Sequence, residues 1–258
     1  MSTIYHEGRV VIRSCDTDVL IVLLTHASSL DLCIWLDIGL SSNNTRRYID
    51  VSRLAAELGE VYCAALPAFH AFTGCDYTAA FMRKGKVCPL EIIEKERNFM
   101  EMFSKLGDHE VIPENVSEKA EAFVCTLYGK PCLTSINDAR FAIFQQVCAP
   151  KRKDAPLEKI KTTDSSLLPP CKAALTEKLK RVNLVASVWK NANKLDPYFL
   201  DPKQNGWILD NSTYKMKWFT GLQIPHSVCK HIVDQPETEP EVDIVYNSSS
   251  DESDADFE

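Results

Sequence analysis

Two short carboxylate motifs contain the residues of this chain best suited to chemistry. Cys15-Asp16-Thr17-Asp18 stands at the start of an apolar run, and Gly74-Cys75-Asp76-Tyr77 follows another. Asp16 and Asp18 are two residues apart, so on a strand their side chains would point to the same face. Converging carboxylates repel one another unless a cation lies between them, and Mg²⁺ prefers such hard oxygen ligands. The first motif therefore predicts a pair of metal-binding carboxylates.

The segments around these motifs predict an α/β arrangement up to Asp76. Val19–Leu24 is a continuous apolar run of the kind that forms a strand buried on both faces of a parallel sheet. Asp50 or Ser52 can cap a helix that Gly59 ends. The sequence also predicts short strands at Arg9–Ile12, Leu32–Leu36 and Tyr48–Ile49, the last returning as a hairpin.

The chain beyond Pro89 has a mostly helical pattern. Helices are predicted over Ser117–Tyr128, Asn137–Val147 and Lys172–Asn193, and a β-hairpin within Asn205–Phe219 turns at Asp210-Asn211-Ser212. Two interpretations of the basic residues on Lys172–Asn193, among them Lys178 and Arg181, stay open. In the first, these residues contact phosphates. In the second, they form an ordinary solvated helix face, which is the more common case.

The order of the carboxylate motifs is similar to that of a known nuclease family. Ser14 to Leu20 resembles the aspartate-x-aspartate segment of the flap endonuclease/XPG-like nucleases, within the PIN-like superfamily. Ile49 to Gly59 resembles a short helix of that family, and Leu66 to Tyr77 resembles its helix ending in Gly-x-Asp-Tyr. The resemblance covers Arg9 to Ile93. It implies a structure-specific nuclease whose catalytic, metal-coordinating residues, with Mg²⁺ or Mn²⁺, are Asp16, Asp18 and Asp76.

The chain also departs from this family. The family builds its site from more carboxylates, and Glu7 is the only acidic residue before Asp16. We therefore expect the C-terminal portion of a nuclease-like domain, weakly active or inactive alone. In place of the family's glycine-rich DNA clamp, Phe81–Val87 carries one glycine and the basic residues Arg83, Lys84 and Lys86. These three are expected to hold a nucleic-acid phosphate, with DNA favoured, and a plain charged turn is the alternative.

A second resemblance extends over nearly the whole chain. Ala65 to Asp76, followed by Lys84-Gly85-Lys86, is similar to a group of multicopy animal proteins associated with mobile elements, as is Leu168 to Leu175. This resemblance implies kinship and assigns no chemistry. His70, on the apolar helix before Asp76, is expected to be a core or interface histidine and not a metal ligand.

Charge is distributed unevenly along the 258 residues. The formal net charge is −7, but residues 235–258 hold nine acidic and no basic side chains, which leaves the remainder at +2. This segment has the composition of a disordered acidic tail, which is expected to stay solvated, to bind a basic protein partner or to compete with DNA. Neither a signal peptide nor a membrane-spanning run is evident, so we expect an intracellular protein of the nucleus or cytoplasm, not secreted, with its ten cysteines reduced.

These observations predict a partial PIN-like α/β domain with a parallel-sheet core, a mostly helical region and the acidic tail. The expected divisions are a nuclease-like portion at 1–105, a helical extension at 106–149, a linker at 150–170, a helix with a β-hairpin at 171–234 and the tail at 235–258. The expected function is that of a degenerate or truncated metal-dependent nuclease. The alternative is a non-catalytic module, domesticated from a mobile element, that binds nucleic acid or protein.

Overall fold

The computed structural model of the protein describes residues 8–30, 32–40, 42, 45–148 and 164–225. Glu7, most of the expected linker and the whole acidic tail lie outside these residues. The described residues belong to one compact unit that extends to Pro225. Among them, no helix combines the length and the apolar character needed to cross a bilayer.

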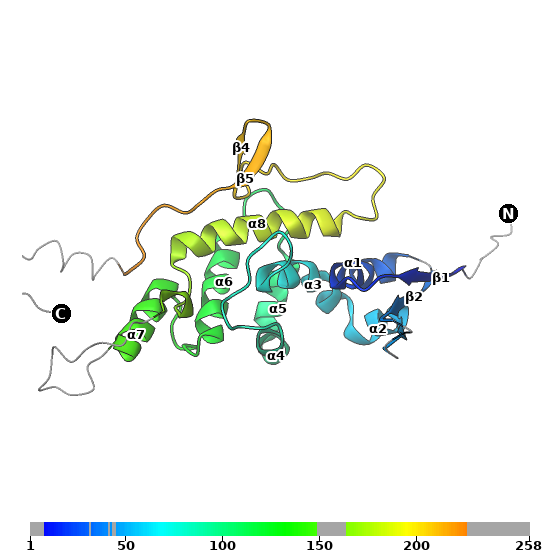
Figure 1. The fold of residues 1–258 in the computed structure, drawn as a ribbon, viewed down its shortest axis with the longest axis horizontal. Helices are drawn as coiled ribbons and strands as arrows, with labels where there is room; N and C mark the ends of the chain where they lie inside the picture. Colours follow the sequence, from blue (N-terminus) through cyan, green and yellow to red (C-terminus); the bar gives the residue numbers. More distant parts are fainter. Residues whose placement is uncertain (1–7, 31, 41, 43–44, 149–163, 226–258) are drawn as a thin grey trace, which may run out of the picture. The chain divides into compact units, whose positions relative to one another are not determined.

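A small mixed sheet forms the N-terminal part (Figure 1). Its strands are β1 (Gly8–Arg13), β2 (Leu32–Ile38) and β3 (Arg47–Asp50), in that spatial order. β1 runs parallel to β2, and β3 pairs with β2 in antiparallel orientation, with Trp35 opposite Asp50. The predicted α/β class and the hairpin return are therefore confirmed, and of the expected parallel-sheet core the structure shows one parallel pair, β1 and β2, in a mixed sheet.

The run Val19–Leu24 is helical, so its prediction as a strand is wrong. It lies within α1 (Thr17–His26), which connects the parallel strands β1 and β2. A continuous apolar run has no period that separates a buried strand from a buried helix. Asp16 decides the outcome locally, because its side chain caps the first turn of α1.

The two helices between the carboxylate motifs form as predicted. Asp50 caps α2 (Val51–Leu58), and Gly59 ends it. The next helix, α3 (Glu60–Thr73), contains Pro67, which cannot donate to the carbonyl of Cys63 one turn earlier. The Cys63 carbonyl therefore lacks its usual helical partner and accepts instead from the Thr25 hydroxyl of α1 at 3.4 Å, which links the two helices.

Helices are the main regular structure of the remaining described chain, as predicted. They are α4 (Val87–Lys95), α5 (Arg97–Ser104), α6 (Glu114–Leu127), α7 (Ile136–Cys148) and α8 (Lys172–Lys190), with short 3-10 turns η1 (Ala27–Ser29) and η3 (Ser165–Leu167). α8 packs against α1, α3 and α6, and lies along one side of them in Figure 1.

One hydrophobic core joins the sheet region to the helices. It contains residues from Ile21 in α1 to Trp189 in α8, and α3 is buried along most of its length. Phe72 of α3 lies at its centre, with ring centroids 5.3 Å from Phe103 and 5.8 Å from Phe123. The segments 8–105, 106–148 and 171–190 therefore depend on the same packed interior.

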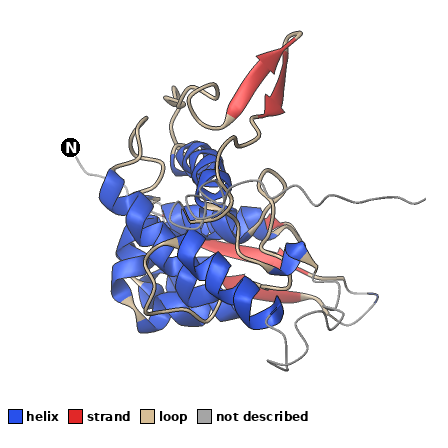
Figure 2. Ribbon diagram, turned by 90° about the vertical axis from the view of Figure 1, so that its left-hand side faces the viewer, coloured by secondary structure: helices blue, strands red, loops and turns tan. Residues whose placement is uncertain are grey.

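The predicted β-hairpin is present and projects from the helices (Figure 2). It consists of β4 (Trp207–Asp210) and β5 (Thr213–Met216), paired in antiparallel orientation. Asn211 and Ser212 form its turn with positive φ angles of 44° and 63°. Two such residues in succession are typical of tight hairpin turns, which explains the polar residues found there.

Candidate functional site

The first carboxylate motif lies at the N-terminus of α1, just after β1. The Asp18 amide donates to Oδ1 of Asp16 at 2.9 Å, so Asp16 is the N-cap of the helix. Asp16 is exposed and the Asp18 side chain is about one-quarter exposed, at 23%. The prediction that the two aspartates share one face of a strand is therefore wrong. They lie together at the start of a helix instead.

A chain of polar contacts links Asp18 to α3 and to the basic segment after it. Oδ1 of Asp18 lies 2.7 Å from Nε2 of the buried His70, and Nζ of Lys86 lies 3.0 Å from Nδ1 of the same ring. The Lys86 ammonium can only donate, so Nδ1 must accept and the ring must carry its proton on Nε2. The geometry therefore fixes a neutral His70 that donates to Asp18. We call Asp18, His70 and Lys86 the polar relay.

The pKa values of the relay agree with this assignment. Burial and the nearby Lys86 charge lower the pKa of His70, against the opposing effect of Asp18 and Asp16. Lys86 is exposed as a residue, but its ammonium also donates to the backbone carbonyls of His70 and Gly74, at 3.2 and 2.6 Å. Desolvation of the ammonium lowers the pKa of Lys86.

The second carboxylate motif forms a tight loop at the end of α3. Gly74 has φ of 120°, and a Cβ there would lie 2.8 Å from Cα of Ala80, so only glycine fits. Cys75 and Thr78 pair across the loop, and the Thr78 hydroxyl donates to the Ala71 carbonyl. Asp76 is left exposed at the tip of this loop.

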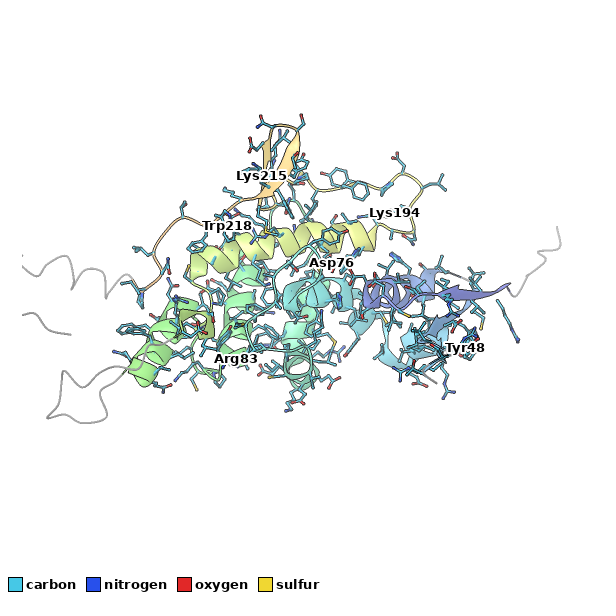
Figure 3. All side chains as sticks on the ribbon, viewed as in Figure 1. Tyr48, Asp76, Arg83, Lys194, Lys215 and Trp218 are labelled. Carbon is cyan, nitrogen blue, oxygen red and sulfur yellow. The ribbon has the colours of Figure 1, made fainter. Side chains whose placement is uncertain are left out.

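The three basic residues expected to hold a phosphate occupy different positions. Arg83 is exposed and has a positive φ of 56°. Lys84 lies over the Tyr128 ring, with Nζ 4.9 Å from the ring centroid. Lys86 turns inward to the polar relay. Figure 3 labels Arg83 well apart from Asp76. The structure thus brings Lys86, and not all three, to the carboxylates.

The carboxylates match a hard divalent cation in chemistry but not in number. Among the described residues, no group of three or more His, Cys, Asp or Glu side chains could hold a metal ion. Asp16 and Asp18 each use Oδ1 in the contacts above, which leaves Oδ2 for other ligands. Two carboxylates in one helical turn fall short of the ligand set of a two-metal phosphodiesterase.

His70 is the relay residue that the sequence did not identify as functional. Its expected core position is correct, since it is 6% exposed, but both ring nitrogens also have polar partners. Its neighbours in the relay are 52 residues before it and 16 residues after it. The one local signal was a histidine on an apolar helix six residues before Asp76.

No family model matches the chain, and no curated protein or solved structure matches it either.

Proposed function

We propose that this protein is a nucleic-acid-binding protein with a degenerate nuclease-like site, which cleaves phosphodiesters weakly or not at all on its own. The polar relay is the observation that carries this proposal. It connects the first carboxylate motif, through His70, with Lys86 in the basic segment that follows the second motif. Asp18 and Lys86, which are far apart in the sequence, thus contact the same histidine ring.

The ligand count argues for binding without efficient hydrolysis. Two-metal hydrolysis needs carboxylates that hold both cations beside the attacking and departing oxygens. Asp16 is engaged as a helix cap and Asp18 by a neutral histidine. These residues therefore lack the free carboxylates that two-metal hydrolysis requires.

Binding to nucleic acid is supported by the basic residues beyond Asp76. Arg83 is exposed, and Lys84 is held over an aromatic ring with its ammonium available to a second partner. Their charges can contact successive phosphates of a strand without reading bases.

A DNA titration tests this proposal. We expect the full chain to bind a labelled single-stranded DNA at low salt. The Arg83→Ala/Lys84→Ala variant should bind more weakly and lower the slope of log affinity against log salt by about one per lost phosphate contact. Lys203→Ala, which removes an exposed lysine outside this region, serves as the control. Equal affinities and slopes for all three proteins would refute the role of Arg83 and Lys84.

A second candidate function is the binding of a single divalent cation by Asp16 and Asp18, with water as the remaining ligands. The observation that favours it is the Oδ2 atom that each of these two carboxylates leaves out of the contacts described above. Asp16→Asn should weaken Mn²⁺ binding in a calorimetric titration, whereas Asp76→Asn should leave it unchanged. If the unmodified chain does not bind Mn²⁺, this candidate fails while the nucleic-acid proposal stands.

A further inference from the structure

A cavity of about 370 Å³ opens between α7, α8 and the loop after the second carboxylate motif. Its volume is near the lower end of the range for small-molecule sites, about 300–1,000 Å³. The walls are largely apolar and aromatic, and include Phe81, Tyr128, Leu168 and Phe219. The cavity is separate from the polar relay, since Asp18, His70 and Lys86 do not line it.

Three cationic side chains line this cavity. Lys178 and Arg181 come from α8, three residues apart and so on one face of the helix, and Arg140 comes from α7. The described lining contains no carboxylate, and none of the three cations forms an ion pair within the described part of the chain. We call Arg140, Lys178 and Arg181 the cationic cluster.

Backbone carbonyls and an aromatic ring position the three cations, and the Glu177 charge acts on Arg181 without an ion pair to it. Lys178 donates to the Ala79 carbonyl and lies over the Phe81 ring, 4.6 Å from its centroid. Arg181 donates through Nη1 to the carbonyls of Gly206 and Lys217, at 3.4 and 3.2 Å. Arg140 donates to the carbonyl of Pro169. Each cation retains N–H groups beyond these bonds, because a lysine has three and an arginine five.

Lys178 is the costliest member of the cluster to keep charged. It is only 9% exposed, and burial together with the Arg181 charge lowers its pKa to about 8. Burial and the neighbouring Arg181 charge both disfavour the charged state of Lys178, and the described residues provide no ion-pair partner to offset them. A bound anion would relieve both the desolvation and the repulsion.

We infer that this cavity binds a phosphomonoester attached to a planar aromatic body, with the phosphate on the cationic cluster and the aromatic body against Phe81, Tyr128 and Phe219. Two guanidinium groups suit the oxygens of a phosphate, which they can contact bidentately. Aromatic walls contact a planar ring by their edges as well as by their faces, and Lys178 and Lys84 already lie over Phe81 and Tyr128. A nucleotide has both parts. The inference does not depend on the proposed function, because it uses neither carboxylate motif nor Arg83.

Free nucleotide and the phosphorylated end of a strand would present the same chemistry. Calorimetric titration of the full chain with adenosine 5′-monophosphate, adenosine and inorganic phosphate tests the site. We expect the monophosphate to bind at least about tenfold more tightly than either fragment, since both halves of the cavity contribute.

A short DNA with and without a 5′-phosphate distinguishes the two sources of this ligand chemistry. A preference for the phosphorylated oligonucleotide over the free monophosphate assigns the site to strand ends, and the reverse assigns it to free nucleotide.

Variants locate the binding. Arg181→Gln and Arg140→Gln should each weaken binding of the preferred ligand at least about tenfold. Lys194→Met removes a lysine just beyond α8 that does not line the cavity, and should leave binding unchanged. Thermal unfolding of each variant shows whether it is folded, and Lys178→Met replaces any variant that is not. The inference is overturned if the wild-type chain binds neither phosphorylated probe, or if folded cluster variants bind as tightly as Lys194→Met.

Discussion

His70 is the residue whose protonation state matters most to the candidate site. Its ring must be neutral to accept from Lys86 while it donates to Asp18. Protonation would place a second positive charge 3.0 Å from the Lys86 ammonium and would break that contact. The relay is therefore expected to be intact at neutral pH and to weaken in acid.

The lowered pKa of His70 predicts a loss of stability on mild acidification. Below the ordinary pKa of 6.5 the unfolded chain takes up a proton at this position while the folded chain does not. The free energy of unfolding therefore decreases as the pH is lowered. Denaturant titrations at pH 7.5 and 5.5 should show a larger loss for the wild type than for His70→Gln. His109→Gln, which changes an exposed histidine, should behave like the wild type. Equal losses in wild type and His70→Gln would contradict the neutral-histidine assignment.

Lys178 has an effect of the same sign at alkaline pH. Its pKa is lowered from 10.5 to about 8 by burial first, then by Arg181 and Lys86, with Cys75 opposing. Between these values the unfolded chain binds the proton and the folded chain does not, so this group adds stability as pH rises. The stability of the wild type relative to Lys178→Met should increase by up to about 3 kcal/mol from pH 7.5 to 10.5. Lys194→Met is the matched control. A difference that is independent of pH would show that Lys178 is not desolvated as described.

At the scale of elements, α8 is held by a buried polar network as well as by apolar packing. Oδ1 of Asn183 accepts from the Gly107 amide at 2.7 Å, and Nδ2 donates to the His109 carbonyl at 2.8 Å and to Asn205 at 3.2 Å. Asn183 is 2% exposed, so water does not replace these partners. The network ties α8 both to the chain after α5 and to the segment before the hairpin.

Loss of this network should be costly. Asn183→Ala leaves buried polar groups without partners and is expected to lower the free energy of unfolding by about 2–4 kcal/mol. Asn193→Ala, at an exposed position after α8, should change it by no more than about 0.5 kcal/mol. Chemical denaturation of the two variants gives the comparison. Similar small effects at both positions would mean that packing alone holds α8 in place.

The elements with local signals were predictable from the sequence. Asp50 and Gly59 mark the two ends of α2, and the polar turn at Asn211 and Ser212 marks the hairpin. Val19–Leu24 carries no such signal, because its apolar residues lack a period and only the cap at Asp16 distinguishes helix from strand.

The contacts that build the candidate site were not predictable, because they join residues far apart in the sequence. The spacing around Asp18 does not reveal His70 as its partner, and the pattern of α8 does not reveal that Arg140 lines the same cavity as Lys178. The sequence predicted that the basic residues of α8 either contact phosphates or form a solvated face. Lys178 does not fit a solvated face, because it is buried.

At the scale of the whole molecule, charge separates the body from the C-terminal segment. Residues 235–258 contain nine acidic and no basic side chains, and the rest of the chain has a formal charge of +2. If the segment competes with nucleic acid for the basic residues, deletion of Gln235–Glu258 should raise DNA affinity at low salt and have less effect at high salt. Fluorescence anisotropy of a labelled DNA measures both. An unchanged affinity at low salt would remove the competition.

We propose that the chain binds nucleic acid through Arg83 and Lys84 and that its carboxylates do not cleave it efficiently. The most direct measurement follows binding and cleavage of one labelled, flapped DNA in the same reaction with Mn²⁺, for the wild type and for Asp16→Asn/Asp18→Asn. We predict that both proteins shift the DNA and that neither cuts it appreciably. Efficient cleavage by the wild type that is lost in the variant would contradict the claim and identify the chain as an enzyme.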